Sequence, residues 1–168
     1  MKRSVKYIIY LAVCALLVVL DQITKNLAVA ALKGKDNAVW IKNVFELEYC
    51  ENTGAAFSSF TGKQGFLLTI TSIVLIIIIV EFVRIPGGKR YAALRIDFLL
   101  IVAGAIGNMI DRVKQGYVVD FFYFVPVNFP RFNVADIYVT VAMALLVVLL
   151  FIVYKDNETE FLFKFKKK

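Results

Sequence analysis

The sequence contains no histidine, and this absence excludes several kinds of catalytic and metal site. Without an imidazole there is no Ser-His-Asp triad, no Cys-His pair, no zinc site of the HExxH type and no histidine proton relay. Any catalysis must therefore use carboxylate, lysine, serine, threonine or tyrosine side chains.

Cysteine is nearly absent as well, since the chain has only Cys14 and Cys50. Cys14 lies within an apolar run, whereas Cys50 lies in a more polar segment that we expect outside a bilayer. The two thiols form no CxxC pair, and we expect neither a disulfide between them nor thiol redox chemistry.

Charged residues are scarce, at 20%, and hydrophobic residues make up 60% of the chain. An average soluble chain reaches about 45–50% only when glycine is included, and the mean hydropathy here is +0.74. Charge is missing altogether from residues 7–20, 64–80, 98–110 and 137–154. Each run approaches the about 20 apolar residues of a spanning helix once flanking Lys and Arg side chains snorkel. The composition excludes a soluble enzyme or a nucleic-acid binder.

The predicted fold is an all-α membrane protein, with four transmembrane helices and a small extracytoplasmic β-element, in a single domain over 1–168. We expect the spans at about 7–32, 64–83, 94–111 and 137–155, and the β-element at about 37–62. Residues 44–49 alternate apolar and acidic side chains, the period of a half-buried strand. The second outer segment, 112–131, is rich in aromatic residues and is predicted to be an interfacial loop.

The distribution of Lys and Arg predicts the orientation. With four spans both termini share one side, and that side carries more cations over short segments than the other. These cations are Lys2, Arg3, Lys6, Arg84, Lys89, Arg90, Arg95, Lys155, Lys164, Lys166, Lys167 and Lys168. Both termini are therefore predicted to be cytoplasmic. The first span is predicted to be retained rather than cleaved as a signal peptide, because branched Val13 stands where a small residue is needed.

Ionisable residues at the edge of a bilayer are costly and are candidates for function. Asp21 and Lys25 are spaced i,i+4 at the end of the first span, so they can pair either as an interfacial salt bridge or within a site. Asn52 and Gly54 follow the predicted strand, where they form either a simple turn or a close approach to a ligand.

The outer end of the third span carries Asn108 and Arg112 on one helix face, four residues apart. Gly104 and Gly107 precede them and allow another helix to pack closely. Packing explains the glycines, but it does not explain an asparagine one turn inside the membrane.

Two carboxylates, Asp120 and Asp136, are predicted to lie at one membrane face. Asp136 has a structural interpretation, because Asn133 as N-cap and Asp136 at the third helical position would form a capping box. Asp120 stands between Val119 and Phe121 and has no comparable local explanation. A functional carboxylate pair and a structural role for Asp136 both remain open from spacing alone.

Five segments, in order and in register, closely resemble the signature blocks of the lipoprotein signal peptidase (signal peptidase II) family. They are Asp21-Gln22-x-Thr24-Lys25, Asn52-x-Gly54-Ala55-Ala56-Phe57, Gly107-Asn108-x-Ile110-Asp111-Arg112, Val119-Asp120-Phe121 and Phe132-Asn133-x-Ala135-Asp136. The resemblance extends from the first span to the fourth.

The resemblance implies an aspartic endopeptidase of the bacterial inner membrane, with its active site at the extracytoplasmic face. Its substrate would be a diacylglyceryl-modified prolipoprotein, cut just before the lipidated cysteine. It implies Asp120 and Asp136 as catalytic residues. It implies that five residues line the site: Asn52, Gly54, Asn108, Arg112 and Asn133. It implies a supporting role for Asp21 and Lys25. No metal or cofactor is implied, and the expected partners are the substrate and membrane lipids around a monomer, with no nucleic acid.

Two alternatives come from other classes. A small proton-coupled transporter would use Asp21 or Asp120 as its proton site, although such sites usually lie near mid-membrane. A Ser-Lys hydrolase would use Ser58 or Ser59 with Lys63, in a polar loop where a lowered lysine pKa is hard to arrange.

Overall fold

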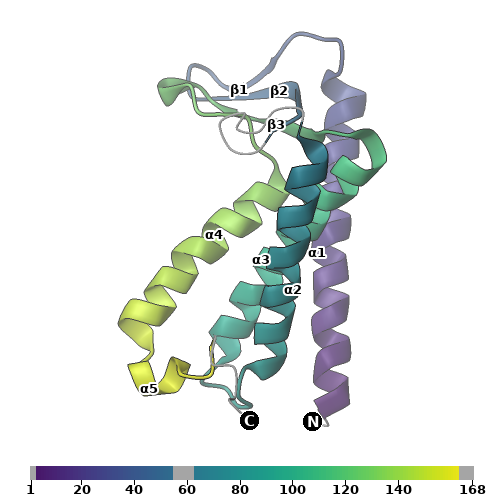
Figure 1. Cartoon of the computed structure of the whole chain (residues 1–168). Coiled ribbons are helices and arrows are strands. Elements are labelled where there is room, and N and C mark those ends of the chain that lie inside the picture. The colour runs from purple at the N-terminus through teal and green to yellow at the C-terminus, as the bar shows by residue number, and fades with distance from the viewer. Residues whose placement is uncertain (1–2, 55–62, 163–168) are drawn as a thin grey trace.

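The computed structural model describes residues 3–54 and 63–162, and its long helices confirm the predicted all-α membrane fold. The helices are α1 (Arg3–Leu32), α2 (Gln64–Arg84), α3 (Ala92–Gln115), α4 (Val134–Val148) and the short α5 (Asp156–Thr159) (Figure 1). A wide turn, η3 (Leu149–Val153), continues α4. Within the described residues, four helices are long and apolar enough to cross a membrane.

Helix α3 is the central helix, because α1, α2 and α4 all pack against it. Its Leu94 and Ala103 are fully buried. Close packing of α4 depends on Gly104, since a Cβ there would stand 2.6 Å from the main-chain oxygen of Ala135. The predicted role of the small residues in this helix is therefore confirmed. Side chains on the outer helix faces, such as Leu11 of α1, are apolar and exposed, as lipid contact requires.

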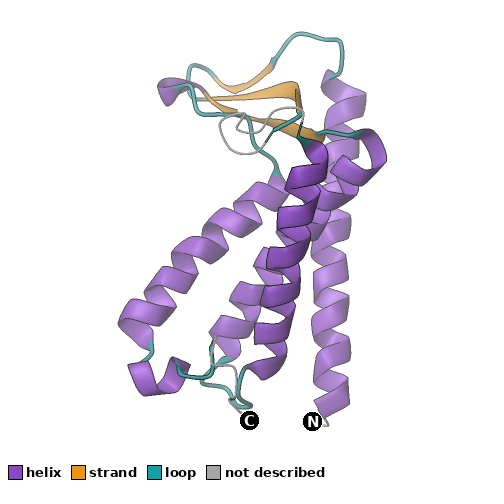
Figure 2. Cartoon of the chain, viewed as in Figure 1, coloured by secondary structure: helices purple, strands orange, loops and turns teal. Residues whose placement is uncertain are grey.

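A three-stranded antiparallel sheet lies at one end of the helices (Figure 2). Its order is β1 (Ala38–Ile41), β2 (Phe45–Asn52) and β3 (Val118–Phe124). The first two strands confirm the predicted β-element, of which 55–62 lies outside the described residues. The start of α1 and α5 lie at the opposite end of the molecule (Figure 1).

The interfacial loop predicted for 112–131 is wrong in its first half. Helix α3 continues to Gln115 and ends at Gly116, which takes a left-handed conformation with φ +79°. Strand β3 follows and pairs with β2, so that Asp120 stands opposite Cys50. The strand shows no alternation in the sequence because consecutive residues from Val118 to Phe121 are all buried.

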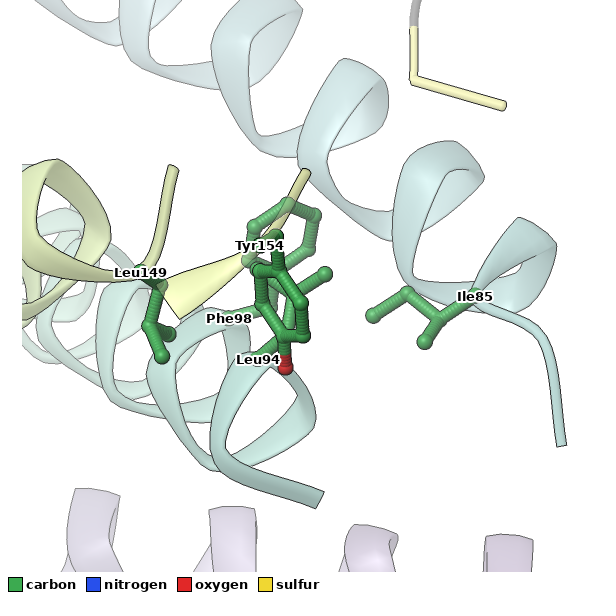
Figure 3. Close-up of a cluster of buried hydrophobic side chains, with 5 residues drawn as sticks. All are labelled: Ile85, Leu94, Phe98, Leu149 and Tyr154. Carbon is green, nitrogen blue, oxygen red and sulfur yellow. The ribbon is translucent and has the colours of Figure 1, made fainter. Parts of the chain in front are cut away.

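The end opposite the sheet is held by an apolar cluster of Ile85, Leu94, Phe98, Leu149 and Tyr154 (Figure 3). The main-chain N–H of Tyr154 donates to the oxygen of Leu149 at 2.8 Å, and its hydroxyl donates to the main-chain oxygen of Arg90 at 3.0 Å. The cluster joins the end of α4 to α2 and α3.

Cys14 and Cys50 form no disulfide and are both free thiols, as predicted.

Candidate active site

The predicted pair of Asp21 and Lys25 exists, and it is buried rather than interfacial. Nζ of Lys25 lies 2.9 Å from Oδ2 of Asp21 and 3.1 Å from Oδ2 of Asp111. The exposed fractions of these three residues are 2% for Lys25, 0% for Asp21 and 4% for Asp111. A buried charge survives only where opposite charges and hydrogen bonds surround it. We call these three residues the Lys25 centre.

The Lys25 centre connects elements that are far apart in the sequence. Oδ1 of Asp21 accepts from the main-chain N–H of Ala135 at 2.9 Å, in the first turn of α4. Oδ2 of Asp111 accepts from the main-chain N–H of Val119 at 3.1 Å, in β3. The centre therefore fixes the two elements that carry Asp136 and Asp120.

Gln22 and Gly107 complete this packing between α1 and α3. Nε2 of Gln22 donates to Oδ1 of Asp111 at 2.9 Å and to the main-chain oxygen of Gly107 at 3.2 Å. A Cβ on Gly107 would stand 2.5 Å from Oδ2 of Asp21. Only glycine lets the carboxylate of Asp21 approach the helix this closely.

A chain of hydrogen bonds runs from the Lys25 centre to Asp136 through Asn108. Nζ of Lys25 donates to Oδ1 of Asn108 at 2.8 Å. Nδ2 of Asn108 in turn donates to Oδ1 of Asp136 at 2.8 Å. The ammonium group thereby orients the amide, and the amide presents its N–H to the carboxylate.

Asn133 connects the two predicted catalytic residues. Its Oδ1 accepts from the main-chain N–H of Asp136 at 3.0 Å, and Oδ2 of Asp136 accepts from the main-chain N–H of Asn133 at 3.0 Å. The capping box considered for this helix start is therefore present. Nδ2 of Asn133 also donates to Oδ1 of Asp120 at 2.7 Å. Asp136 is therefore part of the helix cap, and Asn133 links it to Asp120.

Asn52 and Arg112 approach the site from the other side. Nδ2 of Asn52 donates to Oδ2 of Asp120 at 2.8 Å, and its Oδ1 accepts from the main-chain N–H of Gly54 at 2.9 Å. The main-chain oxygen of Gly54 accepts from Nη2 of Arg112 at 3.1 Å. The predicted turn exists, and it also delivers an amide to a carboxylate.

Asp120 and Asp136 both line a cavity of about 870 Å³ between the sheet and the helices. Asn52, Asn108 and Arg112 line it as well. Its remaining wall is mostly apolar and includes Ile70, Val74, Leu75, Ile78, Ile101, Val139 and Val141. The cavity therefore places two carboxylates beside an apolar channel of the size that holds a small-molecule or peptide ligand.

Burial and charge shape the acidity of Asp120, which is 2% exposed. Loss of solvent, and secondarily the charge of Asp136, raises the pKa of Asp120 to about 7, against the hydrogen bonds from Asn52 and Asn133 that lower it. The carboxyl group thus titrates near neutral pH, the range in which an acid-base residue is most effective.

The sequence-predicted residues all meet in this region, but Gln22 and Asp111 were not among them. Both were within reach of the sequence, because Gln22 adjoins Asp21 and Asp111 lies one turn after Asn108. Ser58 and Ser59 of the hydrolase hypothesis lie outside the described residues.

Comparisons with known proteins give a consistent result. A family model described as "Signal peptidase (SPase) II" matches residues 13–152. A lipoprotein signal peptidase from Lactococcus lactis subsp. cremoris (strain SK11) is 40% identical over 156 residues, covering 92% of this chain and 99% of that protein. One from Clostridium tetani is also 40% identical, over 83% and 89% of the two chains.

Solved structures of bacterial membrane enzymes resemble the fold. One has a TM-score of 0.75 and 29% identity, covering 95% of this chain and 93% of its own. Another has a TM-score of 0.74 and 31% identity, covering 86% and 94%.

Proposed function

The chain belongs to the signal peptidase II family, and from that membership we propose that Asp120 and Asp136 are its catalytic pair. As a family member it is a protease that acts on lipoprotein precursors, which favours this function over a transporter. The observation that carries the proposal is the pair of carboxylates on one cavity wall, both held by the side chain of Asn133 or its main chain.

The chemistry of the pair follows from sharing one proton. Two neighbouring carboxylates do not easily ionise together, and the raised pKa of Asp120 is consistent with a retained proton near neutral pH. The ionised member accepts a proton from the water that attacks the scissile carbonyl. The protonated member donates a hydrogen bond to the carbonyl oxygen as charge develops there. These steps use the chain's own carboxylates and water.

Around the pair, the polar residues have positioning roles. Asn52, Asn108 and Asn133 donate to the carboxylates and set their orientation. Arg112 and the main chain of Gly54 border the cavity, and Nε of Arg112 has no partner within the described part of the chain. That N–H is available to a carbonyl oxygen of the substrate. Asp21 and Lys25 do not line the cavity, and they support the site through Ala135 and Asn108.

The substrate proposed is a diacylglyceryl-modified prolipoprotein, cut just before its lipidated cysteine. The apolar wall of the cavity, with Ile70, Val74 and Val139, suits a hydrophobic signal segment and acyl chains. The polar groups gather at the end of the cavity near the sheet, where the scissile peptide bond would lie.

The orientation proposed has both termini in the cytoplasm and the active site at the extracytoplasmic face of a bacterial cell membrane. Lys6, Arg84 and Arg95 lie near the helix ends opposite the sheet, which is the distribution of cations expected for a cytoplasmic side. We propose one peptidase domain over residues 1–168, acting as a monomer.

The test is a cleavage assay with purified protein in detergent and a diacylglyceryl-modified prolipoprotein. Asp120→Asn and Asp136→Asn should each reduce turnover by at least ~10²–10⁴, because Asn retains the shape but cannot exchange the proton. The double variant should be little worse than either single one, since the pair acts as a unit.

The matched control is Asp36→Asn, which removes an exposed carboxylate outside the cavity and should leave turnover unchanged. Normal cleavage by either single Asn variant at the site would refute the catalytic pair.

A further inference from the structure

A second cavity, of about 380 Å³, lies at the end of the molecule opposite the sheet, where α1 starts, α2 ends and α3 starts (Figure 1). We propose that it binds the phosphodiester headgroup of an anionic phospholipid. Its walls include Lys6, Tyr7, Tyr10, Phe82, Arg84 and Arg95. We call it the basic cavity. This inference is independent of the catalytic roles proposed above, because the basic cavity lies at the other end of the helices.

The charge of the basic cavity is positive. Three cations line it and none of its lining residues is acidic. Arg84 is offset by an ion pair with Glu81, at 2.7 Å from Nη1 to Oε1, but Glu81 is 2% exposed and does not line the cavity. The remaining two cations, on Lys6 and Arg95, have no carboxylate partner among residues 3–54 and 63–162.

Arg95 also gives the basic cavity a fixed edge. Its Nη1 donates to the main-chain oxygen of Gly88 at 3.0 Å, and its Nη2 donates to that of Pro86. These hydrogen bonds hold the turn between α2 and α3, and no carboxylate in the described part of the chain forms an ion pair with the guanidinium group. A cationic group held in place in this way costs little further ordering when an anion binds.

An aromatic wall closes the side between α1 and α2. The ring centroids of Tyr10 and Phe82 are 5.4 Å apart at an interplanar angle of 87°, and those of Tyr7 and Phe82 are 6.4 Å apart at 69°. Edge-to-face packing of this kind is favourable and keeps the rings in fixed positions. The cavity is therefore formed in the protein without a ligand.

A lipid headgroup and a free phosphate ion share the same phosphate chemistry. The position of the basic cavity in the membrane favours the lipid headgroup. Arg84 is the last residue of α2 and Arg95 lies in the first turn of α3, so the cations stand at the depth of the headgroups. Val83, which lines the cavity, is 49% exposed, and Ile79, one turn earlier in α2, is 44% exposed. In α1, Ile9 lies between the lining residues Tyr7 and Tyr10 and is 43% exposed. These side chains can contact the acyl chains of a lipid, whereas a free phosphate ion has no acyl chain to bind there.

The test uses native mass spectrometry of the purified full chain in detergent, titrated with phosphatidylglycerol, phosphatidylcholine of the same acyl chains, or glycerol 3-phosphate. One phosphatidylglycerol should be retained in preference to phosphatidylcholine. Lys6→Gln should weaken that binding by about fivefold, the usual contribution of one cation near an anionic lipid, and Lys6→Arg should preserve it.

The matched control is Lys89→Gln. It removes an exposed cation from the turn between α2 and α3, and Lys89 does not line the basic cavity. It should bind phosphatidylglycerol as the unchanged chain does. Lys6 is exposed, so Lys6→Gln should keep its unfolding temperature. The proposal is overturned by equal binding of phosphatidylcholine, by equal weakening in Lys89→Gln, or by glycerol 3-phosphate binding as tightly as the whole lipid.

Discussion

Asn133 donates a hydrogen bond from Nδ2 to Oδ1 of Asp120 over 2.7 Å while its own side-chain oxygen caps α4. The capped helix carries Asp136 in its first turn. A single side chain therefore sets the position of both carboxylates, one through its amide nitrogen and one through the helix that its oxygen starts. The two functions of this side chain can be separated by substitution.

Replacing Asn133 with alanine should remove both functions. Serine should keep the cap and remove the hydrogen bonds of Nδ2, which go to Asp120, Asn108 and the main-chain oxygen of Val119. We expect Asn133→Ala to lower the free energy of unfolding by about 0.5–2 kcal/mol, the usual cost of losing an N-cap. Asn133→Ser should stay close to the unchanged chain, because its hydroxyl still caps the helix. Both variants should lose cleavage activity, measured beside denaturant unfolding in detergent. A fully active serine variant would show that the bond to Asp120 has no role.

The pH dependence of cleavage should show an alkaline limb near pH 7. Burial raises the pKa of Asp120 to about 7, so the pair loses its shared proton as the pH rises through that value. The same sign applies to stability: a pKa raised on folding stabilises the folded chain at low pH, and this contribution disappears as the pH rises through about 7. Initial rates of cleavage, measured between about pH 5 and pH 9, give the position of the limb directly.

Substituting Asn52 should move that limb. The hydrogen bond from Asn52 lowers the pKa of Asp120, so Asn52→Ala should shift the alkaline limb to higher pH. Asn37→Ala serves as the control, because Asn37 donates to Glu46 and Glu48 on the exposed side of the sheet. A limb that stays in place in Asn52→Ala would mean that another group controls it.

Removing the ammonium group from the Lys25 centre should destabilise the chain strongly. In Lys25→Met the carboxylates of Asp21 and Asp111 lose their common partner while staying buried, a change that typically costs about 3–5 kcal/mol. Lys33→Met removes an ion pair with Glu51 that is largely exposed, and it should leave unfolding nearly unchanged. Comparable unfolding curves for the two variants would contradict a supporting role for Lys25.

The close approach of α3 and α4 gives a test of packing. Gly104→Ala would place a Cβ 2.6 Å from the main-chain oxygen of Ala135, and overpacking of this kind costs about 1–3 kcal/mol. Gly65→Ala meets no atom within 4 Å and should change the free energy of unfolding by less than about 0.5 kcal/mol. Denaturant unfolding of both variants in the same detergent compares them, and an equally stable Gly104→Ala would show that the helices can move apart freely.

The proposed orientation can be measured by labelling single cysteines in a chain whose Cys14 and Cys50 are replaced by alanine. Both natural thiols are free, so this background should remain active. A membrane-impermeant reagent should label Lys35→Cys in intact cells, and it should label Lys89→Cys only after the membrane is opened. Labelling of position 89 in intact cells would show that the orientation is the opposite of the one proposed.

Local features of the sequence predicted the helices and two of the contacts at the candidate site. Long charge-free runs specify spanning helices by themselves, and the i,i+4 spacing of Asp21 and Lys25 specifies their pairing. The capping box at Asn133 is likewise readable, because the donors and acceptors lie within one helical turn.

Contacts between segments that are distant in the chain could not be predicted from local sequence features. Strand β3 has consecutive buried residues and no alternation, so its pairing with β2 depends on a partner far away in the chain. The partnership of Asp111 with Lys25 has the same origin, since it arises from the packing of α3 against α1. A single sequence does not contain the spatial proximity that would reveal either contact.

The turn at residues 86–88 divides the chain into two segments that both contribute groups to the candidate site. The segment before it contributes Lys25 and Asn52, and the segment after it contributes Asp120 and Asp136. Severing the chain there would put both acids, with Asn108 and Asn133, on one fragment and would leave Lys25 and the amide of Asn52 on the other. The two fragments would share the contacts of β2 with β3 and of α1 with α3, so we expect coexpressed fragments to reassemble the site.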